Sequence, residues 1–454
     1  MNLHSCFYVS VILNELPPKQ HISHALKKTI AKFPHLRCNI IKDDKEIYFK
    51  DIISSTNPLY FDDIVEYKEW ESLTEENINS IFKTYSFPYF VDKPLWKLIV
   101  VPKTDQLLLL LDHLLFDGMS AVNIWQSIMS EIPTTNEHLS NDDVIFSLTD
   151  SSSEVSLGKQ HPYESWPVPL SWKLKRTIVK VLFYWFPYSI LSPSPRLLHF
   201  KDYSFPKNIF TDNSKPNKSI YELICDNSQY ILHIGPRKIS TVLEYCKKNK
   251  FSLTAFLSSL FTLSLIESKD KIKNEGSIIK ISVPMNTRNI CKDKLQLPEK
   301  DIQLGNLIAG LDLLYDNDQD HLELKQLATN LQGQLITQSI TNFDETMNNM
   351  KLLDIADTKK FMECKVTPKP GEDRIYPAST FEVTNLGNQD FKSNSKFIVK
   401  DVFFNQPQGT GETYSYSIIS TKNGGLNCCV SYPKPLADVI ESSLRYVNEI
   451  LAEF

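Results

Sequence analysis

The chain has 454 residues, of which 42% are apolar and 11% aromatic, so it can form roughly two or three domains with a substantial core. Its 49 basic and 54 acidic residues give a formal net charge of −5 at pH 7, and without a strongly basic half we expect no nucleic acid among its partners. No apolar run reaches the length of about 18 residues that a membrane-spanning helix needs. The eight cysteines are scattered without zinc-site spacing, so we expect reduced thiols and no metal site.

The N-terminal third alternates between strand and helix patterns. Residues 6–13 form a short apolar run that is typical of a buried strand. A helix is predicted between Pro18 and Pro34, where apolar residues recur at helical spacing. Residues 94–113 read as two strands joined by a short loop, and residues 120–132 as an amphipathic helix.

The rest of the chain repeats this alternation after a polar interruption at 134–160. A second polar loop is predicted at 201–218. Residues 252–268 are apolar all round, which indicates a buried helix, and we expect a later strand to end in a loop at Pro284. Alternating strands and helices predict an α/β fold with mixed sheets. We divide it into an N-terminal subdomain (1–160), a crossover (161–218) and a C-terminal subdomain (219–454).

The leucine run 107–111 leads directly into Asp112 and His113, and Asp117 and Gly118 follow. A strand this apolar is buried on both faces, and we expect Gly118 to permit the turn into the next helix. Neutral imidazole at the end of such a strand suits proton transfer near neutral pH. His-x-x-x-Asp alone is a weak pattern that also fits a core histidine beside a turn aspartate. The strand before it, the glycine and the helix after it favour the catalytic interpretation.

The stretch "PLWKLIVV…LLLLLDHLLFDGMSAVNIW" resembles the chloramphenicol acetyltransferase-like superfamily, which includes peptide-synthetase condensation domains and plant acyltransferases. Within it, the chain is most similar to fungal alcohol O-acetyltransferases and related fungal N-acetyltransferases. The segments "WPVPLSWKLK", "FSLTAFLSSLF", "VPMNTR", "LGNLI" and "EVTNLG" follow in the order of the family's landmarks. The plant branch's Asp-Phe-Gly-Trp-Gly motif is absent, and "DVFFNQPQG" occupies its place.

The resemblance implies two subdomains with a substrate tunnel at their interface. It implies that His113 is the general base for acetyl transfer from acetyl-CoA to a hydroxyl or amine, without an acyl-enzyme and without a permanently bound cofactor. It also implies that Asp117 is structural and pairs with Arg288, the arginine of "VPMNTR". We expect a monomer.

The segment "EVTNLG" offers Thr384 and Asn385 as possible oxyanion donors. A simple turn at Gly387 would need asparagine and glycine equally, so both interpretations stay open.

The acceptor is predicted from residues 171–191, where basic residues precede and interrupt an apolar, aromatic patch. This segment could lie on a membrane surface or pack over the tunnel mouth, and both options favour an apolar alcohol or a long-chain, sphingoid-like amino alcohol. We expect a cytoplasmic protein, peripheral on the endoplasmic reticulum or the lipid droplet surface if the membrane interpretation holds.

Other functional classes fit the sequence less well. A non-catalytic lipid-binding or scaffold protein of the same fold would have no reason to keep His113, Asp117 and Gly118 together. A condensation domain should be accompanied by a carrier-protein domain with its serine attachment motif. Hydrolase and nucleotide-binding signatures such as Gly-x-Ser-x-Gly and the Walker loop are absent.

Overall fold

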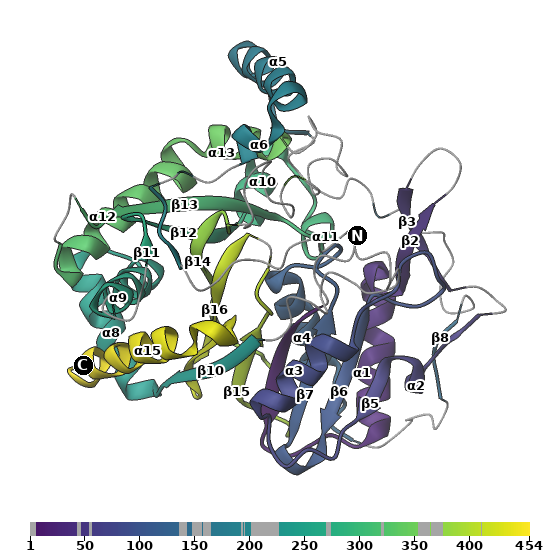
Figure 1. Cartoon of the computed structure of the whole chain (residues 1–454). Helices are drawn as coiled ribbons and strands as arrows, with labels where there is room; N and C mark the ends of the chain where they lie inside the picture. The colour runs from purple at the N-terminus through teal and green to yellow at the C-terminus, as the bar shows by residue number, and fades with distance from the viewer. Residues whose placement is uncertain are drawn as a thin grey trace.

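The computed structural model describes residues 6–42, 47–53, 57–135, 143–147, 157, 165–191, 194, 196–200, 227–268, 274–318, 322–352, 364, 376–409 and 411–454. The polar loop predicted at 201–218 and much of the stretch at 134–160 lie outside these residues. The described chain forms two α/β bodies side by side, one built mainly from the N-terminal third and one from the second half (Figure 1). The predicted mixed α/β class is confirmed, because each main sheet combines parallel and antiparallel pairs.

The first sheet has the strand order β15-β1-β7-β6-β5. Its strands are β15 (Val399–Asn405), β1 (Phe7–Leu13), β7 (Gln106–Leu111), β6 (Trp96–Val101) and β5 (Val65–Tyr67). Every residue of β7 is buried, since β1 and β6 pair with its two edges and helices pack around the sheet. These helices are α1 (Lys19–Lys32), α3 (Glu75–Thr84) and α4 (Gly118–Glu131).

The second sheet has the strand order β10-β17-β16-β14-β12-β13. Its strands are β10 (Asn227–Ile234), β17 (Gly425–Pro433), β16 (Glu412–Thr421), β14 (Ser379–Gln389), β12 (Ile278–Asn286) and β13 (Ile308–Asp316). The helices of its core are α8 (Pro236–Asn249), α9 (Leu253–Glu267), α12 (Leu324–Ile336) and α15 (Ala437–Ala452). Helix α9 is the predicted all-apolar helix, and it is buried between α12 and α15.

One strand of the second half belongs to the first sheet. Strand β15 lies antiparallel to β1, with Phe404 opposite Val9, and it also packs against β16 and β17. The division of the sequence into 1–160, 161–218 and 219–454 assigns β15 to the C-terminal subdomain, although this strand belongs to the first sheet. It ties the two bodies together and places the residues that follow β15 between them.

The expectation that a strand ends in a loop at Pro284 is wrong, because β12 continues to Asn286. Pro284 pairs with Gly310 of β13, whereas the register with β14 involves only Ile281 and Ser282. Proline has no N–H to donate to a neighbouring strand. Here it lies beyond the part of β12 that pairs with β14, so the proline ring removes no hydrogen bond on that side.

The remaining described elements are short or peripheral. They are η1 (Pro34–Arg37), β2 (Cys38–Lys42), β3 (Ile47–Asp51), β4 (Leu59–Tyr60), α2 (Phe61–Ile64), η2 (Pro102–Thr104), β8 (Val144–Phe146), α5 (Leu170–Trp185), α6 (Pro187–Leu191), β9 (His199–Phe200), β11 (Asn274–Glu275), α10 (Arg288–Leu295), α11 (Glu299–Ile302), η6 (Thr337–Thr341), α13 (Phe343–Met350) and η8 (Lys434–Leu436). In the described part of the chain no single helix is long and apolar enough to cross a membrane; α8 and α9 pass that test only as a pair, bent by 102°.

Candidate active site

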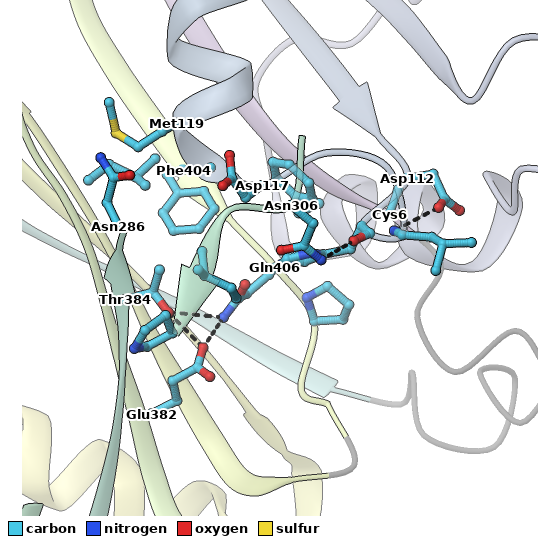
Figure 2. Close-up of a pocket in the computed structure, with 18 of the residues that line it drawn as sticks. Cys6, Asp112, Asp117, Met119, Asn286, Asn306, Glu382, Thr384, Phe404 and Gln406 are labelled. Atoms are coloured by element: carbon cyan, nitrogen blue, oxygen red, sulfur yellow. Dashed lines mark hydrogen bonds between the residues drawn. The ribbon is translucent and has the colours of Figure 1, made fainter. Parts of the chain in front are cut away.

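A cavity of about 520 Å³ lies where the two bodies meet. Both halves of the chain contribute side chains to it, and Figure 2 shows Cys6, Asp112 and Met119 around the same space as Asn286, Glu382 and Gln406. The described lining residues are Cys6, Phe7, Tyr89, Asp112, His113, Leu114, Asp117, Gly118, Met119, Pro284, Asn286, Asn306, Ile308, Glu382, Thr384, Asn385, Leu386, Phe404, Gln406, Pro407, Gly411 and Glu412. No lysine or arginine is among them.

His113 lies in the turn that follows β7 and lines this cavity. The turn is closed by Phe116 N–H donating to the carbonyl of Asp112 at 3.1 Å, and the imidazole stacks at a tilt on Phe7, with 5.0 Å between ring centroids. Asn306, from the second body, donates to the His113 carbonyl at 2.9 Å. Burial lowers the pKa of His113 below its usual 6.5, against smaller upward effects of its own backbone and of Asp117. The ring is therefore neutral near neutral pH and can accept a proton.

Asp117 and Arg288 form a buried, two-pronged ion pair across the two bodies. Arg288 Nη1 and Nη2 donate to the two carboxylate oxygens of Asp117 at 2.7 and 2.8 Å, and the side chains are only 6% and 1% exposed. The same carboxylate accepts the backbone N–H of Ser120 at 2.8 Å, as N-cap of α4, and that of Leu307 at 2.9 Å. Burial opposes ionisation, but the charge of Arg288 and these hydrogen bonds outweigh it and lower the pKa of Asp117. Both carboxylate oxygens are thus engaged away from His113.

Gly118 contributes to the site in a different way from the one expected. Gly118 is the first residue of α4 and does not have the positive φ that only glycine adopts readily. The backbone of the turn therefore does not need a glycine. A Cβ at this position would lie 2.4 Å from a methyl carbon of Leu386. The glycine therefore allows the second body to approach the start of α4 closely.

Thr384 and Asn385 lie on β14, and both also line the cavity. The hydroxyl of Thr384 donates to Glu382 at 2.6 Å. Asn385 accepts the N–H of Gly387 at 2.8 Å, where φ is +76°, and donates to Thr254 at 3.2 Å. The turn alternative is not what the structure shows, because β14 continues through Gly387 to Gln389, with a shift in its register to β16 between Asn385 and Asn388. An oxyanion role for either residue stays a prediction.

Sequence reasoning missed three of the carboxyl groups that line the cavity, those of Asp112, Glu382 and Glu412. Asp112 accepts the Tyr89 hydroxyl at 3.0 Å, and burial raises the pKa of Asp112 to about 6 despite this bond and the one from Leu114 N–H. Burial and the nearby charge of Glu412 raise the pKa of Glu382 to about 8. Alternation along β14 could have revealed Glu382, because it lies two residues before Thr384 and on the same face of the strand.

These groups define what the cavity can do chemically. A neutral imidazole can remove a proton from a bound nucleophile, while carboxyl groups can bind a cation or a hydrogen-bond donor. Among the residues that the structure describes, no group of three or more His, Cys, Asp and Glu side chains is arranged to hold a metal ion.

Comparisons with known proteins agree with this architecture. Residues 1–453 match the model of the alcohol acetyltransferase family. The chain is 36% identical to the N-acetyltransferase SLI1 of Saccharomyces cerevisiae, over 99% of this chain and 96% of that protein.

Solved structures are similar at the level of the fold. They include the trichothecene 15-O-acetyltransferase TRI3 of Fusarium sporotrichioides (TM-score 0.59, 11% identity, covering 98% of this chain and 91% of that one). The condensation domain of the Monacolin K polyketide synthase MokA has a TM-score of 0.59, with 11% identity and coverage of 99% and 92%. The first condensation domain of the CDA synthetase has a TM-score of 0.57, with 11% identity and coverage of 99% and 92%.

Proposed function

Because the chain belongs to the alcohol acetyltransferase family and is an acetyltransferase, we propose that it moves the acetyl group of acetyl-CoA to the hydroxyl or amine of an apolar acceptor, with His113 as general base. The observation that carries this proposal is the neutral imidazole of His113, half-buried on a cavity that both bodies line. A core histidine, the alternative interpretation of the motif, would not be expected to line a cavity.

In the proposed reaction the acceptor atom attacks the thioester carbonyl of acetyl-CoA while His113 takes its proton. The tetrahedral intermediate then expels CoA thiolate, which receives the proton from the imidazolium. No acyl-enzyme is needed, because both substrates meet in one cavity. A general base contributes about 10²–10⁴ in rate, and holding two reactants together contributes much of the rest.

Asp117, Arg288 and Gly118 would support this chemistry by position. The ion pair joins the start of α4 to α10. It therefore fixes the end of the turn that carries His113, which lies between β7 and α4. Gly118 lets Leu386 approach the same helix end. None of the three needs to touch a reacting atom.

The apolar acceptor is supported by the cavity wall near His113. Phe7, Leu114, Met119, Leu386 and Phe404 line it. Such side chains favour an alkyl chain over a sugar or a charged metabolite.

An acceptor panel tests the proposed function. Purified protein incubated with acetyl-CoA and a series of long-chain alcohols and amines should release CoA thiol only when an acceptor is present. CoA should also raise the thermal midpoint, since ligands that bind the native state stabilise it. A lipid-binding or scaffold protein would instead bind the acceptors with no CoA release above the uncatalysed rate, and that result would reject the transferase proposal.

We further propose that α5 (Leu170–Trp185) rests on a membrane surface. Figure 1 shows this helix projecting from the second body. Trp172 and Phe183 are the buried residues of α5. Its other face bears a stripe of exposed apolar side chains, with Leu170 83% and Trp185 69% exposed. The exposed apolar side chains of the helix and the next residue are Leu170, Leu174, Ile178, Val181, Leu182, Tyr184, Trp185 and Phe186.

A lipid bilayer is the occupant that suits this stripe. Lys173 and Lys180 flank it at helical spacing, so apolar side chains could enter the interface while ammonium groups face anionic headgroups. No described residue of α5 lines the cavity, which disfavours the lid alternative. We accordingly propose a monomer in the cytoplasm, peripheral on the endoplasmic reticulum or the lipid droplet surface.

Flotation with vesicles tests the membrane contact. The protein should float with phosphatidylcholine vesicles that contain phosphatidylserine, and raised salt should weaken this binding. The double substitution Leu174→Glu with Ile178→Glu should abolish it, whereas Ile340→Glu, at an exposed apolar site 70% accessible on η6, should not. Equal flotation of the two variants would contradict the proposal, as would a wild-type protein that stays unbound and instead self-associates in sedimentation.

A further inference from the structure

The cavity contains more carboxyl groups than its proposed chemistry needs. Four carboxyl groups line it, those of Asp112, Asp117, Glu382 and Glu412. Asp117 is ion-paired with Arg288, but no lysine or arginine is among the described lining residues. Buried carboxylates that face a cavity without basic side chains favour a cationic ligand.

Glu382 and Glu412 form the acidic end of this cavity. They lie on paired strands, β14 and β16, and both line the cavity; the charge of Glu412 also raises the pKa of Glu382. Figure 2 shows Gln406 reaching to Glu382 and Thr384, and the Gln406 amide donates to Glu382. Hydrogen bonds from an amide and a hydroxyl hold the Glu382 carboxyl in place beside the cavity.

A second observation on the same sheet face points to a missing polar partner. Ser415 lies beside Glu382 in the register of β14 and β16, and Ser417 beside Thr384, so their side chains share that face. Both serines are fully buried, and their hydroxyl oxygens have no hydrogen-bond partner in the described structure. Buried hydroxyls are normally paired, so the layer behind Glu382 and Thr384, which themselves line the cavity, has unused hydrogen-bonding capacity for a polar group or ordered water.

Proton accounting distinguishes an amine acceptor from an alcohol. An alcohol loses one proton when it becomes an ester, and His113 can take it. An amine is bound from solution as ammonium, R–NH₃⁺, because its pKa lies near that of lysine, about 10.4. It must therefore lose two protons to become an amide, and His113 accounts for only one of them.

We propose that Glu382, together with Glu412, forms a subsite for the ammonium group of an amine acceptor and that Glu382 takes its first proton. This inference rests on the proposed acetyl transfer. In the free protein Glu382 holds a proton near neutral pH, because burial and the charge of Glu412 raise its pKa to about 8. The charge of bound R–NH₃⁺ favours release of that proton to solvent. The Glu382 carboxylate then accepts one proton from R–NH₃⁺, and the nitrogen lone pair of the neutral amine forms the C–N bond at the thioester carbonyl. His113 takes the second proton, the C–S bond breaks, and the thiolate receives that proton. Glu382 is then protonated, as it was before the acceptor bound, so the subsite is ready for the next acceptor.

Acceptors that differ only in the reacting group test the subsite. A primary amine and a primary alcohol of equal chain length are compared by kcat/KM for wild type, Glu382→Gln and Glu412→Gln. A hydrogen bond to a charged group contributes about 1.5–3 kcal/mol, so the amine-to-alcohol ratio of kcat/KM should fall about 10- to 100-fold in Glu382→Gln. Glu449→Gln, an exposed change on α15, should leave the ratio unchanged.

The outcomes separate the subsite from the proposed function. If amine and alcohol turnover fall together in folded Glu382→Gln protein, the residue is structural and the subsite is rejected. If wild type acetylates neither acceptor, the proposed function fails, and calorimetric titration with the amine alone decides about the subsite. Amine binding that is at least tenfold weaker in Glu382→Gln would support it, and equal binding by both proteins would reject it. Glu412→Gln gives the same readout if Glu382→Gln does not fold.

Discussion

Replacing His113 with alanine should lower kcat for acetyl transfer by about 10²–10⁴-fold, the usual contribution of a general base. Without the imidazole, the proton of the attacking hydroxyl or amine would have to pass to water. Release of CoA thiol with a saturating acceptor measures the effect. KM should change much less than kcat, because the base acts on the transition state rather than on substrate binding.

Two controls keep the His113 prediction specific. The ring also packs on Phe7, so the thermal midpoint of His113→Ala must stay near that of wild type for the kinetic loss to be meaningful. The pH profile of wild type is the second control. Burial lowers the pKa of His113, and a base works in its deprotonated form. Turnover should therefore persist below pH 6.5 and fall only at more acid pH, with no loss from this group on the alkaline side. Unchanged turnover in His113→Ala would sink the proposed mechanism.

Local patterns were sufficient to predict the elements that carry the site. The leucine run became the central strand β7, and the all-apolar segment became the buried helix α9, because both depend on short-range spacing and burial. The return of β15 to the first sheet could not be predicted, since pairing of Phe404 with Val9 is a contact between distant parts of the chain. That one pairing brings the residues after β15 to the cavity.

Site residues were predictable only in two cases. Either they belong to a motif that is continuous in the sequence, or the family resemblance named them as the partner of a motif residue. His113, Asp117 and Gly118 follow one another closely, and the resemblance named Arg288. The reason for Gly118 depends on contact with Leu386 from the other body, which no local pattern contains. Glu382 was overlooked because a glutamate in a half-buried strand resembles a solvated position until the opposing wall is known.

Replacing Asp117 with alanine should lower the free energy of unfolding by about 3–5 kcal/mol, because it leaves the Arg288 guanidinium buried without its anion. That is a large share of the about 5–15 kcal/mol that stabilises a typical domain. Loss of soluble protein or a sharply lower denaturation midpoint measures the effect. Asp62→Ala is the matched control, because its ion pair with Lys19 is exposed and long, at 3.7 Å, and such pairs contribute about 0–1 kcal/mol.

Removing both charges should be less harmful than removing one. The double variant Asp117→Ala with Arg288→Leu no longer buries an unpaired guanidinium, so it should recover part of the lost stability. It would still lack the hydrogen bonds that Asp117 accepts from Ser120 and Leu307, and the turn carrying His113 should stay loosened. An Asp117→Ala protein that is as stable as wild type but has no turnover would contradict this account, because Asp117 would then act in the reaction itself and not through the stability of the turn.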